Sequence, residues 1–145
     1  MSQRVTDAGF VPEDWTGPIP PLAEAGPDAP AVEIDSATRS EALAGRIGTL
    51  RLVRIRVASF ADGRAFTLAR QLRRQGYAGR LRAAGPLIAD QYPMARRAGF
   101  DEVEIDDAMA ARQPEPQWRA QSNWRRSHYQ SLLAGASLPN CSKSV

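Results

Sequence analysis

The stretch from Val53 to Leu72, VRIRVASFADGRAFTLARQL, contains the signals of a strand, a loop and a helix in succession. Its first five residues alternate between apolar and charged side chains, which predicts a strand with one apolar face. Asp62-Gly63 predicts a tight turn, because Gly accepts a positive φ and Asp hydrogen-bonds the neighbouring backbone. From Ala65 to Gln75 apolar residues recur at helical spacing, so a helix follows the loop.

Three further segments alternate with period two and are predicted strands: Ala31–Asp35, Arg80–Ala83 and Glu102–Asp106. Helical spacing predicts helices over 38–47 and 86–98, the second kinked or split at Pro93. This strand–helix–strand order indicates parallel strands joined by right-handed crossovers. We therefore predict an α/β fold: a small four-stranded parallel sheet with crossover helices mainly on one face, as in half of a β/α barrel.

The face of the sheet opposite the helices is predicted to be charged, because each strand keeps its charged residues on one side. A charged face requires solvent, ion pairs or a partner. Sequential strand order places the two arginine-bearing strands side by side between acidic ones. The order 2-1-3-4 would alternate bases and acids, but it would place the first helix over a charged surface. We prefer the sequential order.

The ends of the chain differ from this central region. Residues 1–30 contain six prolines and are predicted to form an extended arm that runs neither as a helix nor as a central strand. Residues 31–133 are predicted to form a single α/β domain with a C-terminal helical region, which folds back over the sheet or mediates a dimer contact. Residues 134–145 are predicted to be a disordered tail.

Composition excludes several classes of protein. The chain has 145 residues and lacks an apolar run of the length that spans a membrane. Its N-terminus lacks the apolar core of a signal peptide. The chain has a single cysteine, Cys141, which excludes an internal disulfide and an all-cysteine metal or iron–sulfur site. It also has a single histidine, His128, so there is no histidine cluster. We expect a cytoplasmic protein that holds no metal of its own.

Basic residues are concentrated in the middle of the chain. Residues 46–100 carry twelve arginines against only Asp62 and Asp90. A basic segment can bind nucleic acid, but aromatic residues are not interleaved with these arginines. We therefore do not expect a nucleic-acid partner.

Several motifs, taken together and in this order, resemble the bacterial family known as domain of unknown function 934. They are Phe60-x-Asp62-Gly63-Arg64, Phe66-x-Leu68-Ala69-Arg70-x-Leu72-Arg73, Gly79-x-Leu81-Arg82-Ala83-x-Gly85, Asp90-Gln91 and Gly99-Phe100-Asp101. Members of that family are commonly found beside sulfite reductase, and some carry an oxidoreductase label. The resemblance implies a role in sulfur assimilation and cysteine biosynthesis, and it implies no particular reaction.

Ligands of open α/β sheets bind beyond the carboxyl ends of the strands, where the loops after the second and third predicted strands lie. There Arg64, together with Arg82 from the charged face of the sheet, could clamp a sulfate- or phosphate-like group, and Gly85 would allow close approach of the backbone. The competing interpretation is structural, with Asp62 capping the helix and Arg64 paired to Asp90. The candidate anion-binding residues are Asp62, Gly63, Arg64, Arg82, Gly85, Asp90 and Gln91.

The sequence contains no dinucleotide-binding glycine motif, no P-loop and no cysteine pair, so no cofactor is evident. We expect an accessory protein of assimilatory sulfate or sulfite reduction, which acts through a partner such as sulfite reductase or through an anionic ligand. The alternative is a small enzyme, a candidate oxidoreductase, with Asp62, Arg64 and Asp90 near the reacting group. In a third interpretation, two copies form a homodimer that covers their charged sheet faces.

Overall fold

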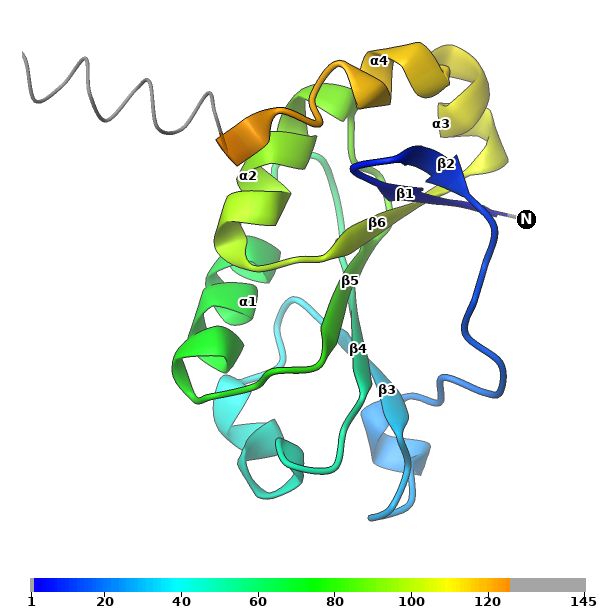
Figure 1. Cartoon of the computed structure of the whole chain (residues 1–145). Coiled ribbons are helices and arrows are strands. Elements are labelled where there is room, and N and C mark those ends of the chain that lie inside the picture. The colour runs from blue at the N-terminus through cyan, green and yellow to red at the C-terminus, as the bar shows by residue number, and fades with distance from the viewer. Residues whose placement is uncertain (1, 126–145) are drawn as a thin grey trace, which may run out of the picture.

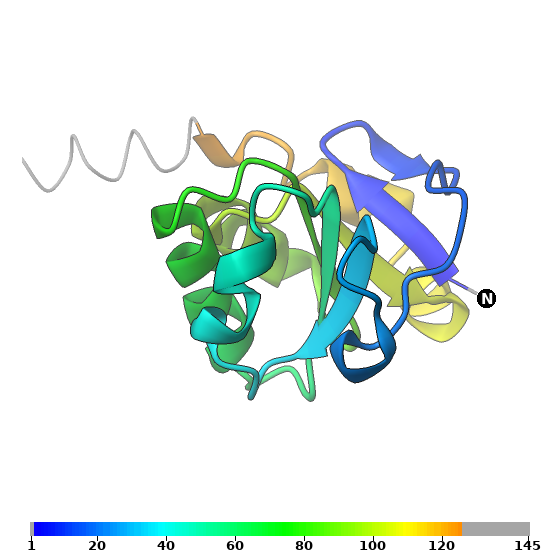
Figure 2. The same cartoon turned by 90° about the horizontal axis from the view of Figure 1, so that it is seen from below.

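The computed structural model of the chain describes residues 2–125. Its elements, in chain order, are β1 (Ser2–Thr6), β2 (Gly9–Val11), η1 (Leu22–Glu24), β3 (Ala31–Asp35), η2 (Ser40–Arg46), β4 (Leu52–Arg56), α1 (Arg64–Arg74), β5 (Arg80–Ala84), η3 (Ala89–Gln91), α2 (Tyr92–Ala98), β6 (Glu102–Asp106), α3 (Asp107–Arg112) and α4 (Glu115–Arg119). The η elements are short 3-10 helices. The strands form one sheet with α1 and α2 on one face, and the segment that follows β2 runs along the other (Figures 1 and 2). η1 lies beside the edge strand β3, where Pro21 forms a bridge with Glu33.

The fold is α/β, as predicted, and the four alternating segments lie as parallel neighbours in the sequential order β3-β4-β5-β6. The arginine-bearing strands are adjacent, with Arg54 of β4 in register with Arg82 of β5. Glu33 of β3 and Glu102 of β6 are in register with these arginines from the two flanking strands. The charged residues therefore share one face of the sheet, and the apolar residues share the other.

The predicted sheet of four strands is too small, because β1 and β2 extend it to six in the order β2-β1-β6-β5-β4-β3. β1 is an interior strand, antiparallel both to β2 and to β6. The prediction of an extended arm over residues 1–30 therefore fails for the first eleven residues. These residues precede Pro12, so every backbone N–H there is free to join a ladder, and Val5 is fully buried in the core.

Two helical segments also differ from their predictions. The segment predicted as a helix over 38–47 is the 3-10 helix η2, and the helix predicted from Pro86 begins only at Tyr92. The predicted split near Pro93 is confirmed, because η3 ends at Gln91 and Pro93 lies in the first turn of α2. Proline fits there since the first turn has no intrahelical acceptor for its missing N–H.

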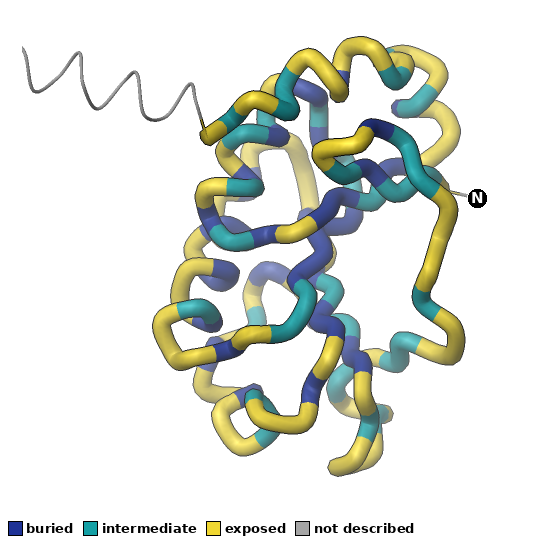
Figure 3. The backbone as a smooth tube through the Cα atoms, in the orientation of Figure 1, coloured by how far each residue is buried: buried dark blue, intermediate teal, exposed yellow. Residues whose placement is uncertain are grey.

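The core fills the space between the sheet and the helices, where most residues of β3, β4, β5 and β6 and one side each of α1 and α2 are buried (Figure 3). Phe66 of α1 and Phe100, just after α2, meet edge to face with ring centroids 6.2 Å apart. This contact joins the two crossover helices over the centre of the sheet.

The segment after β6 packs beside the N-terminal hairpin (Figure 1). Glu115 of α4 accepts a hydrogen bond from the backbone of Phe10 at 2.9 Å, and buried Trp118 donates its indole N–H to the carbonyl of Gln113. The later part of the predicted C-terminal helical region and the predicted tail, 134–145, lie outside the described residues, as do His128 and Cys141. Within 2–125, no helix is long and apolar enough to cross a membrane.

Candidate functional site

The loop between β4 and α1 is organised around the buried carboxylate of Asp62. One of its oxygens accepts hydrogen bonds from the Ser36 hydroxyl at 2.5 Å and from the Ala58 N–H at 3.1 Å. The other accepts from the backbone N–H of Arg64 at 3.2 Å and from its guanidinium Nε at 3.3 Å. Asp62 therefore fastens the ends of β3 and β4 to the start of α1.

These bonds fix the charge of Asp62. The hydrogen bond from Ser36 is the largest influence, and together with the Ala58 and Arg64 bonds it lowers the pKa of Asp62 to about 2 although burial opposes it. The carboxylate is ionised at neutral pH, and both of its oxygens are occupied. Such a group holds a loop in place, and it is poorly suited to carry a proton.

Arg64 pairs with Asp62 rather than with Asp90, and its side chain stays 66% exposed. It borders a pocket of about 330 Å³ between η2 and the flank of α1. Hydroxyl groups and a second arginine, Arg39, share this pocket, and the Arg39 side chain is 83% exposed and lies 3.7 Å from Glu41. The lining residues are Ser36, Thr38, Arg39, Ser40, Glu41, Arg64, Thr67, Leu68 and Gln71.

Asp90 and Gln91 lie in η3, before α2, and do not line this pocket. Gln91 accepts a hydrogen bond from the Ile88 N–H at 3.0 Å and donates to the Phe60 carbonyl at 2.7 Å. Asp90 is exposed and accepts from Gln121 at 3.4 Å. Gln91 thus ties the loop after β4 to the entry of α2.

Gly85 lies at the end of β5, where the chain approaches another strand closely. Its φ is +139°, and a Cβ at this position would lie 2.5 Å from the carbonyl oxygen of Val57. Its N–H donates to the Glu104 carbonyl at 3.1 Å. The glycine is therefore explained by backbone contact alone.

Arg82, by contrast, lies under the arm on the charged face of the sheet, fully buried. Its guanidinium donates to Glu102 at 2.6 Å, to Glu104 at 3.0 Å and to both oxygens of Glu13 at 2.7 and 2.8 Å. Each nitrogen has a carboxylate partner, so the predicted role of Arg82 as an anion clamp conflicts with its surroundings. The hydrogen bond from Arg82 is also the main cause that lowers the pKa of Glu13 to about 2.

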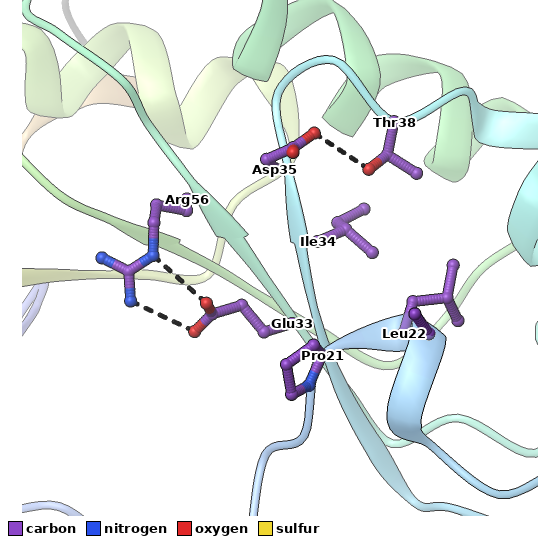
Figure 4. Close-up of a pocket in the computed structure, with 8 residues that line it drawn as sticks. Pro21, Leu22, Glu33, Ile34, Asp35, Thr38 and Arg56 are labelled. Carbon is purple, nitrogen blue, oxygen red and sulfur yellow. Dashed lines mark hydrogen bonds and ion pairs between the residues drawn. The ribbon is translucent and has the colours of Figure 1, made fainter.

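A larger cavity of about 520 Å³ lies between β3 and η1 (Figure 4). At its wall Arg56 donates to both oxygens of Glu33, at 3.1 and 3.2 Å, and Thr38 donates to Asp35 at 3.1 Å. The polar groups of this cavity are satisfied by one another, and two carboxylates border it. An anion would therefore meet fewer free donors here than in the pocket of Arg39 and Arg64.

The chain matches the model of the family described as "Bacterial protein of unknown function (DUF934)" over residues 31–137. The chain belongs to this family. The match begins at the first residue of β3, so it includes the four parallel strands, and the N-terminal hairpin precedes it. No curated protein and no solved structure matches the chain.

The seven predicted site residues of this family member are thus brought to three places. Asp62, Gly63 and Arg64 lie where the β4–α1 loop enters α1, Arg82 lies in β5 with Gly85 directly after that strand, and the pair 90–91 lies in η3, before α2. In addition, no group of three His, Cys, Asp or Glu side chains among residues 2–125 is placed to hold a metal ion. The arrangement at Arg39 and Arg64 offers two exposed guanidinium groups to an oxyanion. The hydroxyl groups of Ser36, Thr38 and Thr67 in the same pocket already donate to other acceptors.

Sequence reasoning missed most of the residues that surround Arg64. Thr67 and Gln71 follow it at intervals of three and seven along α1, so they share its helical face and could have been found by spacing. Arg39 and Ser40 come from a segment more than twenty residues earlier. No periodicity connects that segment to α1, and only the fold places the two together.

Proposed function

We propose that this protein is an accessory component of assimilatory sulfate or sulfite reduction that binds an anionic ligand between η2 and α1. The observation that carries the binding part is the presence of two exposed guanidinium groups, Arg39 and Arg64, in one pocket. Guanidinium groups are suited to sulfate-, sulfite- or phosphate-like groups. The metabolic part rests on what the resemblance of the motifs implies, because the description of the matched family assigns no function.

The accessory role is preferred to the small enzyme because of what the polar groups of the loop do. Asp62 is held ionised by its neighbours, and Gln91 has both ends of its amide hydrogen-bonded. These side chains hold the backbone. A reaction at this site would instead require a group free to exchange a proton or to attack a substrate.

The ligand site can be tested by titrating the purified protein with sulfate, sulfite, phosphate and adenylyl sulfate. The melting temperature of the protein is measured at each anion concentration. We expect one of these anions to raise the melting temperature by mass action, and Arg39→Ala or Arg64→Ala to remove the effect. Arg70→Ala is the matched control, since Arg70 is exposed on α1 and does not line the pocket. Equal responses in all three variants would refute the site.

The metabolic role requires a separate experiment in the source bacterium. Deletion of the gene is expected to impair growth on sulfate or sulfite as the sulfur source and to leave growth on cysteine normal. If the pocket serves that role, complementation with the Arg39→Ala/Arg64→Ala variant should fail to restore growth on sulfate or sulfite. Normal growth of the deletion strain on every sulfur source would contradict the proposal.

A further inference from the structure

Part of the positive charge of the helix layer has no acidic partner: Arg73 pairs with Asp101 and Arg96 with Asp7, and three further arginines are unpaired among residues 2–125. α1 and α2 together contain six arginines and no acidic residue. Two of them point between elements and are bonded there: Arg73 donates to the Gly99 carbonyl at 2.8 Å, and Arg96 to the Phe100 carbonyl at 2.6 Å. Arg70, Arg74 and Arg97 are exposed, and none has a hydrogen-bond or ion-pair partner among residues 2–125.

These three arginines belong to one surface. Arg70 and Arg74 are four residues apart on α1, so they lie on the same face of the helix, one turn apart. Arg97 is on α2, which lies beside α1 in the helix layer (Figures 1 and 2). Arg70 and Arg74 do not line the anion pocket, although each follows a lining residue, Thr67 or Gln71, by three positions on α1. The surface therefore adjoins that pocket and shares no residue with it.

The same surface holds the two exposed large hydrophobic side chains of the described part of the chain, Phe60 at 45% and Met94 at 42%. Phe60 is tied to the entry of α2 by the 2.7 Å bond from Gln91 to its carbonyl. Met94 follows Gln91 by three residues, and Arg97 follows Met94 by three, so they form one stripe along α2. We call Phe60, Arg70, Arg74, Met94 and Arg97 the helix-layer patch.

Folding does not require this composition. Acidic residues at a helix N-terminus are favourable and like charges one turn apart are unfavourable, yet α1 begins with Arg64 and places Arg70 one turn from Arg74. Exposed Phe, Met and Arg together are the residues enriched in the cores of protein interfaces. The patch therefore costs some stability and presents what a binding surface needs.

We propose that the helix-layer patch docks an acidic surface of another protein, with Phe60 and Met94 as apolar anchors. Residues 126–145 carry Arg126 and Lys143 and no acidic residue, so the charge of that segment does not complement the patch. A two-fold dimer through the patch would bring like charges together. The proposal concerns residues outside the anion pocket and stands whether or not that pocket is occupied.

The test uses two acidic polypeptides as probes, poly-L-glutamate and the random copolymer poly(Glu,Tyr), with a 20-base-pair DNA duplex beside them at about 0.15 M salt. The full-length protein is expected to bind the copolymer more tightly than poly-L-glutamate, because tyrosine rings can contact Phe60 and Met94. R70E/R74E/R97E should weaken the binding of both polypeptides at least about tenfold. F60S/M94S should weaken only the binding of the copolymer, by about threefold or more.

The control variant is R51E/R112E/R119E, which makes the same change of charge at exposed arginines outside the patch. It is expected to bind both polypeptides within about twofold of the unmodified protein. Equal weakening by the two triple variants would refute a defined surface, and so would the absence of saturable copolymer binding. Tighter binding of the DNA duplex through Arg70, Arg74 and Arg97 would overturn the proposal in favour of a nucleic-acid partner.

Discussion

Gly85 is a position where the absence of a side chain is required by a neighbouring strand. Its φ of +139° is unfavourable for other residues, and a Cβ would overlap the Val57 carbonyl oxygen. We predict that Gly85→Ala lowers the free energy of unfolding by about 2–4 kcal/mol in urea denaturation. Gly63→Ala is the control, because Gly63 has a φ of −74° and a Cβ added there would meet no other atom within 4 Å. Gly63→Ala should leave the free energy of unfolding unchanged or raise it slightly. Equal losses of this free energy in Gly85→Ala and Gly63→Ala would contradict the role given to Gly85.

The ionised state of Asp62 predicts a pH dependence. Its pKa is lowered from 3.8 to about 2 in the folded protein. The stabilisation is therefore fully present above pH 3.8 and is lost as the pH falls through about 2. Asp62→Asn should reduce the free energy of unfolding by about 2 kcal/mol at pH 7. The difference between the two proteins, measured in urea at several pH values, should stay constant from neutral pH to about pH 5 and shrink below about pH 4. A difference that is the same at pH 2.5 and pH 7 would exclude this role of the charge.

At the scale of elements, β5 is joined to the arm through one buried guanidinium. Arg82 is fully buried between Glu102, Glu104 and Glu13, whereas the Glu13 side chain is 48% exposed. Arg82→Met should cost about 3–5 kcal/mol, since it leaves buried carboxylates without a counter-charge. Glu13→Gln should cost only about 1 kcal/mol, because Arg82 keeps its other two partners. The free energies of unfolding of the two variants are compared by urea denaturation. Similar losses would show that the contact with the arm, and not the buried charge of Arg82 on the sheet, accounts for most of the stabilisation.

The strands that the sequence predicts well are those with charge on one face and apolar residues on the other. β3 and β6 have the predicted bounds because each reads as a strict alternation, Ala31–Asp35 and Glu102–Asp106. β1 and β2 were missed because ten residues with few apolar side chains give no such pattern, and their pairing partner β6 is about a hundred residues away. η2 has apolar residues at helical spacing, and that spacing did not distinguish a 3-10 helix from an α-helix.

The candidate site could be predicted only where its residues are close together in the sequence. Asp62 and Arg64 are two residues apart, and their turn chemistry is visible in the sequence. Arg82 was predicted on the charged face of the sheet and free to reach an anion, because an arginine on a strand gives no sign of its neighbours. Its occupation by Glu13 depends on a loop that crosses the sheet, and that contact spans 69 residues. Long-range ion pairs of this kind follow from topology, not from spacing.

For the whole molecule, the two faces of the sheet differ in how charge is balanced. On the side without helices, Arg4, Arg54, Arg56 and Arg80 are paired with acidic residues of neighbouring strands or the arm. A homodimer is therefore not needed to neutralise that face. On the helix side, Arg64, Arg73 and Arg96 pair with Asp62, Asp101 and Asp7. Arg70, Arg74 and Arg97 have no acidic partner among residues 2–125, so the helix-layer patch remains basic. The pattern favours a partner on the helix side.

The N-terminal hairpin completes the molecule at the edge of β6, which predicts the effect of removing it. β1 pairs with β6 along its length, Val5 is fully buried, and Asp7 accepts a hydrogen bond from Tyr92 of α2 at 2.5 Å. Deletion of residues 1–11 would leave β6 as an exposed edge and remove part of the core. We predict that the shortened protein aggregates or loses cooperative thermal unfolding, as seen by size-exclusion chromatography and circular dichroism.

Two point variants on β1 separate this effect from the loss of chain length. Val5→Asp places a charge at a fully buried position and should cost more than about 3 kcal/mol. Ser2→Asn changes an exposed residue of the same strand without placing a like charge opposite its register partner Asp106, and it should cost less than about 0.5 kcal/mol. If the shortened protein were monomeric and melted at the temperature of the full chain, the hairpin would be an accessory to the fold. If both the deletion and Val5→Asp are severe, β1 is part of the core that the four parallel strands need.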